Sequence, residues 1–357
     1  MKLKRLRVNR ILTRILFWTR NHLLVIFLAF LSFLLILSFL KIRNVLIHHQ
    51  LVPQNTLTFF SSPEKILDST GGRTNFLLLG IRGENPSEVS DLTDTIILAS
   101  YSHHQQQLTL LSVPRDLWVN SLKTKINAVY HYGQQRQPQI GFQLSNAAIL
   151  ETIGLPVHYN LVIDFQAFTD IINLLEGVEI NVPHAFIDDQ FPIPGKENAY
   201  PVSERYQTIE FQVGPQTMDG TTALNYIRSR HAEGEEGTDI ARSRRQQLII
   251  KAIQQEILTV NFFLNQQNRD AFFQIIQTHT LTDVTSDLYP SLARLALDSR
   301  SHPINSISLS YEPDENGITF LDVPPSYLYQ GQWVLVAHDN NWQAFQQYIL
   351  NRLDDTQ

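Results

Sequence analysis

The hydrophobic pattern from residue 73 onward alternates between short apolar runs and segments of helical period. Continuous apolar runs without polar alternation suit strands that are covered on both faces. The predicted strands are 75–81, 95–101, 108–113, 157–164, 178–182 and 305–311, and the predicted helices are 142–153, 165–175 and 241–258. Strands interleaved with helices predict an α/β domain with a central sheet.

Two connecting segments refine this picture. A hairpin across residues 105–107 would make the central sheet mixed. Residues 183–212 are rich in proline, glycine and polar groups, so we expect an irregular loop with edge strands.

The N-terminal part of the chain has a different pattern. Residues 23–40 are apolar and carry no charge, and a helix needs about twenty such residues to cross a bilayer. A buried core helix is the alternative, but such helices seldom lack polar residues on every side. Seven basic residues precede this run: Lys2, Lys4, Arg5, Arg7, Arg10, Arg14 and Arg20.

Only Lys41 and Arg43 follow the run closely, so the positive-inside bias predicts a cytoplasmic N-terminus. No small-residue cleavage site follows, which indicates an uncleaved signal anchor in a cell membrane that is crossed once. We therefore expect a cytoplasmic basic segment at 1–22, a transmembrane anchor at 23–40, a spacer at 41–72 and an extracytoplasmic domain at 73–357.

Charge is unevenly distributed along this chain. It has 28 Lys+Arg against 34 Asp+Glu, yet residues 226–247 contain five arginines. The guanidinium group presents a planar fork of donors that matches phosphate oxygens in pairs. A phosphate or pyrophosphate ligand is the obvious candidate, and a solvated basic helix face is the alternative.

The spacing within this segment adds a geometric prediction. Arg228 and Arg230 are two residues apart, so on a strand they would point the same way. Arg242, Arg245 and Gln246 would share one face of a helix. Asp239 stands at the predicted N-cap. A strand end facing the first turn of that helix would form a concave anion site.

A second polar group lies at the predicted strand ends. Asp91 and Asp94 precede the strand 95–101, Arg115 and Asp116 follow the strand 108–113, and Lys125 comes soon after. Carboxylates near phosphate-binding groups can hold Mg²⁺, with Asp94 as the first choice and Asp91 as the second. The alternatives are a turn role for Asp91, a strand cap for Asp94 and ordinary ion pairs for Arg115 and Lys125.

Two classes of site are excluded by composition and motif. The chain has no cysteine, so it has no disulfide, thiol nucleophile or cysteine metal site. It also lacks a glycine-rich nucleotide-binding motif. A domain outside the cell would also have no ATP, so phosphoryl transfer there would need a donor that is already activated.

Taken together, these short polar and apolar segments resemble the LytR–CpsA–Psr family over about residues 73–255. The matching stretches are 76–80, 93–95, 112–116, 125–127, 226–230 and 239–247. The resemblance implies a mixed sheet flanked by helices in three layers. It also implies a Mg²⁺- or Mn²⁺-dependent phosphotransferase that attaches glycopolymers to peptidoglycan. The donor would be a polyprenyl-pyrophosphate-linked glycan, the products a phosphodiester and polyprenyl phosphate, and no nucleic acid would be a partner.

The resemblance also implies roles for individual residues. Asp94 would bind the metal and act with Arg115 in catalysis. The pyrophosphate would be held by Arg115, Arg228, Arg230, Arg242 and Arg245, with Gln246, Lys125 and Asp239 completing the polar site. Many members have an aspartate after the first strand, where this chain reads Ile81-Arg82-Gly83-Glu84. Asp91 or Glu84 could supply the second carboxylate, and Asp91 or Asp116 the general base.

Two other functions fit the same residues. One is a membrane-anchored receptor that holds lipid-linked glycans without turnover. The other is a polyprenyl-pyrophosphate hydrolase, in which water rather than a sugar hydroxyl receives the phosphoryl group.

Overall fold

The computed structural model describes residues 58–59, 61–83, 92–137, 140–257, 265–300, 302–313 and 317–354. The predicted anchor at 23–40 lies outside these ranges. Within them, no helix has both the length and the apolar character that crossing a bilayer requires. The described residues all belong to one compact unit.

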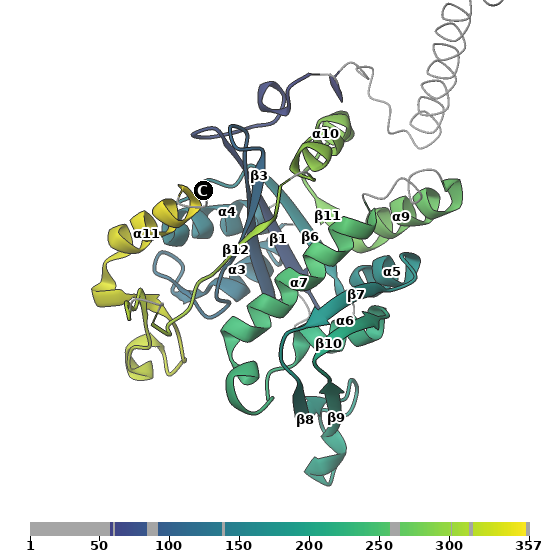
Figure 1. Ribbon diagram of the computed structural model, residues 1–357. Helices are drawn as coiled ribbons and strands as arrows, with labels where there is room; N and C mark the ends of the chain where they lie inside the picture. Colours follow the sequence, from purple (N-terminus) through teal and green to yellow (C-terminus); the bar gives the residue numbers. More distant parts are fainter. Residues whose placement is uncertain are drawn as a thin grey trace, which may run out of the picture. The chain divides into compact units, whose positions relative to one another are not determined.

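The domain is built on a six-stranded sheet with the order β11-β6-β1-β2-β3-β12 (Figure 1). Its strands are β1 Arg73–Ile81, β2 Thr95–Ser102, β3 Gln107–Ser112, β6 Tyr159–Asp164, β11 Thr280–Thr282 and β12 Asn305–Ser308. The β1–β6 and β3–β12 pairs are parallel and the other pairs are antiparallel. The mixed sheet and the hairpin between β2 and β3 are therefore confirmed.

Helices cover both faces of this sheet. On one face lie α3 Ile126–Gln134, α4 Ile140–Ile153 and α11 Trp342–Asp354, and on the other lie α7 Asp239–Ile257 and α10 Tyr289–Ser299. Alternation along β1 serves both layers, because Leu77 and Leu79 pack with the first group while Phe76 and Leu78 face the second. The predicted three-layer arrangement is confirmed, and Figure 1 shows α7 crossing the sheet.

A smaller apolar cluster extends the domain beside α7. Its elements are α5 Phe165–Leu174, β7 Val178–Val182, β8 Phe186–Pro192, β9 Tyr206–Phe211, β10 Gly214–Met218 and α6 Gly220–Arg228. β7 pairs with β10, and β8 with β9. The edge strands expected within 183–212 are thus β8 and β9.

The remaining elements are short or peripheral. They are α9 Gln266–His279, the ribbons β4 Trp118–Val119 with β5 Thr124–Lys125 and β13 Leu321–Asp322 with β14 Val336–Ala337, and the 3-10 helices η2 Pro63–Lys65, η3 Val202–Arg205, η4 Gly234–Gly237, η5 Ser286–Leu288, η6 Ser326–Tyr329 and η7 His338–Asn340. The sequence pattern did not predict α3. It packs closely on α4, since a Cβ on Gly133 would lie 2.5 Å from the Gly141 Cα.

Candidate functional site

Three strand ends meet at one edge of the sheet. The antiparallel register pairs Gly80 at the end of β1 with Thr95 at the start of β2, and Ile97 with Ser112 at the end of β3. Asp94 is fixed at this edge because its backbone N–H donates to the Gly80 carbonyl at 3.1 Å. The residues that flank these strands are therefore neighbours, as the sequence predicted.

Arg228 and Arg230 reach this edge from a helix rather than a strand. The predicted strand is wrong: α6 runs from Gly220 to Arg228, and Arg230 follows in the loop after it. Asp219 caps the helix, since its carboxylate accepts a hydrogen bond from the Thr222 N–H at 2.7 Å. The Tyr-Ile pair before Arg228 continues a helical pattern that also buries Ala223 and Tyr226.

The first turn of α7 brings Arg242 to the same place. The helix cap is Thr238, whose Oγ accepts from the Ala241 N–H at 3.2 Å, so the N-cap predicted for Asp239 is one residue late. Asp239 is instead the first helical residue and pairs with Arg242 at 2.7 Å. Farther along, Gln246 donates to the Thr95 hydroxyl at 3.0 Å and joins α7 to the start of β2.

Asp94 lies at the centre of a cationic cluster. Arg115 donates to its Oδ1 at 2.6 Å, Arg230 lies 3.7 Å from the same oxygen, and Arg82 lies 3.5 Å from Oδ2. Burial raises the pKa of the Asp94 carboxyl, but the charges of Arg230, Arg115 and Arg82 outweigh burial and leave this pKa below its usual value. Asp94 is therefore ionised at neutral pH.

Asp116 forms a second anionic anchor beside Asp94. Its Oδ1 accepts from the Lys125 Nζ at 2.6 Å, and its Oδ2 lies 3.3 Å from the Arg115 Nε. Both oxygens therefore hold cationic side chains. This arrangement favours a positioning role for Asp116 over that of a general base.

We define the arginine cluster as Arg82, Arg115, Lys125, Arg228, Arg230 and Arg242, with Asp94, Asp116 and Asp239. Six cations face three carboxylates, so the cluster has excess positive charge. Burial and the neighbouring charges of Arg242 and Arg115 lower the pKa of Arg230 to about 10. Such crowding of like charges favours binding of an anion.

Several arginines of the arginine cluster have donors without a hydrogen-bond partner among the described residues. The Nε atoms of Arg115 and Arg242 are buried and have none, although the Arg115 Nε lies 3.3 Å from the Asp116 Oδ2. The Arg228 guanidinium lies over the rings of Phe165 and Phe191, at 5.0 and 5.4 Å from their centroids, and no hydrogen bond to a described residue involves it. Buried polar groups are normally hydrogen-bonded, so the buried Arg242 Nε indicates a ligand or ordered water.

Arg245 does not belong to the arginine cluster, although the sequence placed it on the phosphate-binding face. Its guanidinium is buried and donates to the carbonyls of Tyr226, Ser229 and Glu236 and to the Glu236 carboxylate, at 2.7–2.9 Å. These bonds tie α7 to the loop that follows α6. Arg245 therefore holds in place the backbone that carries Arg228 and Arg230.

Asp188 on β8 holds the same loop from another side. It is fully buried, and its Oδ2 accepts from the Ser229 hydroxyl and from the backbone N–H groups of Arg230 and His231, at 2.7–3.1 Å. Its Oδ1 accepts from the Gln190 N–H. The loop that carries Arg230 is thus held by hydrogen bonds from two buried charged side chains, the anionic Asp188 and the cationic Arg245.

The predicted divalent-cation site is a poor match to these surroundings. Mg²⁺ is usually held by carboxylates together with phosphate oxygens, but both oxygens of Asp94 already face guanidinium groups. Two unit charges about 4 Å apart interact by about 4 kcal/mol near a protein surface, and a divalent ion doubles this repulsion. Asp91 and Glu84, the predicted second ligands, lie outside the described residues.

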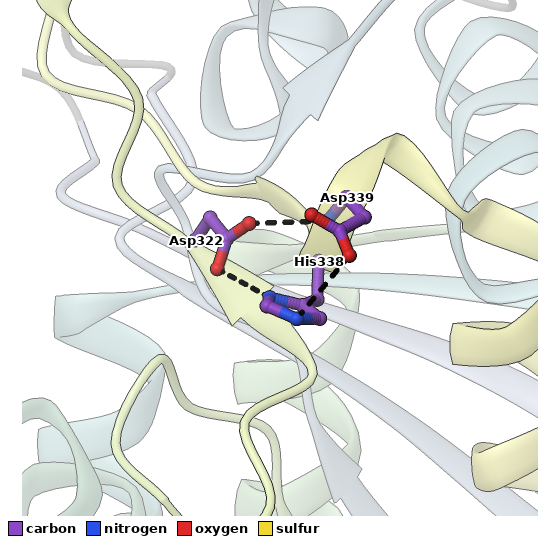
Figure 2. Close-up of side chains that lie close together, drawn as sticks. All are labelled: Asp322, His338 and Asp339. Atoms are coloured by element: carbon purple, nitrogen blue, oxygen red, sulfur yellow. Dashed lines mark hydrogen bonds and ion pairs between the residues drawn. The ribbon is translucent and has the colours of Figure 1, made fainter.

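Among the described residues, one group of three possible ligands could hold a metal ion, and it lies far along the chain from the arginine cluster. Asp322, His338 and Asp339 converge on the β13–β14 ribbon (Figure 2). The His338 Nδ1 lies 2.8 Å from the Asp322 Oδ1, and the Asp339 N–H donates to Oδ2 at 3.1 Å. Both oxygens of Asp322 are used locally, so this group is explained as an exposed ion-pair cluster that ties the ribbon to η7.

Comparison with known proteins identifies the family of this chain. The sequence matches the LytR_cpsA_psr family over residues 40–335. The chain belongs to this family. Among its relatives, the polyisoprenyl-teichoic acid–peptidoglycan teichoic acid transferase TagU of Enterococcus faecalis is 26% identical over 230 residues, which are 63% of this chain and 65% of TagU. The enzyme of the same description, TagT of Bacillus subtilis, is 29% identical over 54% of this chain and 56% of TagT.

The alignments therefore span less than two thirds of these relatives of the LytR_cpsA_psr family. Solved structures of the family share the fold. The crystal structure of B. subtilis TagV matches 81% of this chain and all of that chain, with a TM-score of 0.55 and 20% identity. At this identity the likeness supports the fold alone.

Proposed function

We propose that this chain is a phosphotransferase that attaches a glycopolymer to peptidoglycan outside the cell membrane. The donor is a glycan linked through pyrophosphate to a polyprenyl lipid. A hydroxyl oxygen of the acceptor forms a new bond to the phosphorus that carries the glycan. The bond from this phosphorus to the bridging oxygen breaks, so a phosphodiester forms and polyprenyl phosphate leaves with the electron pair.

One observation supports this proposal above all. The arginine cluster gathers six cationic side chains against three carboxylates, and the buried Arg242 Nε has no hydrogen-bond partner among the described residues. A pyrophosphate donor brings two anionic phosphates, which complement this excess charge. The names of TagU and TagT add the chemical class, because both act on teichoic acid and peptidoglycan.

In this proposal the predicted residues have different tasks. Arg228, Arg230 and Arg242 contact the phosphates, and their charges stabilise the negative charge that collects on the equatorial and leaving oxygens. Asp94 keeps Arg115 and Arg230 oriented and is not itself a phosphate ligand. Lys125 extends the cationic surface from Asp116.

The acceptor hydroxyl must also lose its proton. Asp116 is engaged with two cations, so Asp91 is the better of the two predicted proton acceptors in this proposal. The predicted Mg²⁺ or Mn²⁺ cofactor is not part of the proposal, because the described surroundings of Asp94 fit guanidinium groups instead.

The test is a transfer assay with the full-length chain in membranes, a lipid-linked glycopolymer and a peptidoglycan acceptor. Arg228→Ala and Asp94→Ala should each abolish most transfer, whereas Arg136→Gln removes an exposed positive charge outside the arginine cluster and should leave the rate unchanged. Full transfer in both alanine variants would contradict the proposal.

The two alternative functions give different outcomes in the same assay. A receptor would bind the donor and form no product. A hydrolase would release the polymer carrying a terminal phosphate, with an oxygen atom from water, even when the acceptor is present.

A further inference from the structure

Arg82 stands where the chain would need an anion if it were to bind a divalent cation beside Asp94. It directly follows β1, and Gly83 then turns the chain with a φ of +85°, a conformation that suits glycine. The Arg82 Nε lies 3.5 Å from the Asp94 Oδ2. The charge of Arg82 also contributes, after burial, to lowering the pKa of Arg228, so Arg82 is close to both residues.

Asp94 is thus surrounded by cations on two sides. Arg115 and Arg230 face its Oδ1, and Arg82 faces its Oδ2. A divalent ion on this carboxylate would have to displace a guanidinium group and then stay among the others. Among the described residues, the grouping of three carboxylate or histidine ligands occurs at Asp322 and not here.

We propose that Arg82 takes the charge-compensating place of a divalent cation, so that this chain binds pyrophosphate with protein cations alone. The inference rests on the proposed function, because it concerns how that pyrophosphate is held. The Arg82 side chain is half exposed, at 51%, and its Nε lies beside Asp94. A guanidinium group supplies both charge and directed donors to phosphate oxygens.

This arrangement has a measurable consequence that separates it from a metal site. Pyrophosphate binding should persist when divalent ions are removed. It should depend on Arg82 itself, because no bound ion would compensate for the loss of its charge.

The experiment measures binding of inorganic pyrophosphate to the full-length chain in detergent by calorimetry, once with EDTA and once with Mg²⁺. We expect the natural chain to bind in EDTA, with no gain from Mg²⁺ once complex formation between Mg²⁺ and free pyrophosphate is taken into account. Arg82→Gln should weaken binding in EDTA about tenfold, the lower end of what a charge-assisted hydrogen bond contributes. Arg136→Gln is the matched control and should bind as the natural chain does.

Arg82→Asp gives the sharpest contrast, because it places a second carboxylate beside Asp94. This variant should lose binding in EDTA and recover part of it with Mg²⁺. Circular dichroism of each variant checks that the fold is kept.

The outcomes separate the two proposals. If the natural chain binds pyrophosphate only with Mg²⁺, or if Arg82→Gln binds normally in EDTA, the role of Arg82 is overturned while the proposed function stands. If the natural chain binds pyrophosphate in neither condition, the proposed function fails and this inference fails with it.

Discussion

Replacing Asp188 by asparagine should destabilise the domain and loosen the loop that carries Arg230. The carboxylate is fully buried and accepts four hydrogen bonds, from the Ser229 hydroxyl and from the N–H groups of Gln190, Arg230 and His231. The asparagine side chain would keep the shape, lose the charge and turn an N–H₂ group toward at least one of these donors.

The expected cost follows from the four contacts. A hydrogen bond to a charged group contributes about 1.5–3 kcal/mol and one between neutral groups about 0.5–1.5 kcal/mol. The three donors to Oδ2 would each lose nearly 1 kcal/mol when this oxygen becomes neutral, which gives about 3 kcal/mol before the Gln190 N–H contact is counted. This cost is smaller than the usual stability of about 5–15 kcal/mol. Asp188→Asn should therefore fold, with a clearly lower free energy of unfolding.

The assay is urea denaturation of the full-length chain in detergent, followed by tryptophan fluorescence. Asp189→Asn is the matched control, since Asp189 is the exposed neighbour on the same strand and should change stability by less than about 0.5 kcal/mol. If Asp188→Asn lowers the free energy of unfolding no more than Asp189→Asn does, the hydrogen bonds of Asp188 do not stabilise the loop, and this prediction is wrong.

The contribution of Asp188 to stability should also depend on pH. Burial raises the pKa of Asp188, but the hydrogen bonds from Ser229, His231, Arg230 and Gln190 outweigh burial, so the pKa in the folded protein lies below the usual value. The stability from this group is therefore complete above the unfolded pKa of about 3.9 and is lost as pH falls through the folded pKa. The difference between natural chain and Asp188→Asn should be constant near neutral pH and shrink in acid.

Two further predictions concern other buried or paired charges. Arg245→Met should lower the free energy of unfolding by about 3–5 kcal/mol, because it leaves the Glu236 carboxylate buried without its cation. Arg244→Met, at the exposed neighbouring position, should have little effect in the same urea titration. The hydrogen bond and the charge of Asp322 should raise the pKa of His338 above its ordinary value, and Asp322→Asn should bring it down in an NMR titration. The contribution of His338 to stability is full below its unfolded pKa and is lost as pH rises through the folded pKa. An unchanged His338 pKa in Asp322→Asn would contradict this explanation of the ribbon.

The sheet could be predicted from sequence because its strands are nearly continuous apolar runs. β1, β2 and β3 fall within two residues of the predicted ranges, and β7 matches its range. The positions of Asp94 and Arg115 followed from this, since residues that flank neighbouring strands meet at a sheet edge. The local hydrophobic pattern was therefore enough to predict that Asp94 and Arg115 lie close together.

Other features depend on tertiary contacts that spacing does not determine. The spacing of Arg242 and Arg245 predicts a shared helix face. The Arg245 guanidinium nevertheless donates its hydrogen bonds to the end of α6 and the loop after it, and so does not reach the arginine cluster. The helix that ends at Arg228 was missed because a Tyr-Ile pair also suits a strand. Asp188 did leave a signal: it is in phase with the buried Phe186 along β8, which is an unusual position for a charge.

Arg82 was visible in the sequence only as the place where an expected aspartate is missing. Its partnership with Asp94 requires that the end of β1 and the start of β2 lie side by side, and the antiparallel register provides this. At the place where an aspartate was expected as a metal ligand, we therefore propose that the oppositely charged Arg82 binds pyrophosphate.

In the proposed function, arginines from the end of α6 and the start of α7 hold one pyrophosphate. The most direct measurement is a crystal structure of the chain with a short isoprenyl pyrophosphate. We expect phosphate oxygens within hydrogen-bonding distance of Arg228, Arg230 and Arg242. A pyrophosphate bound elsewhere on the domain, with these three side chains unchanged and not in contact with it, would contradict the proposed function.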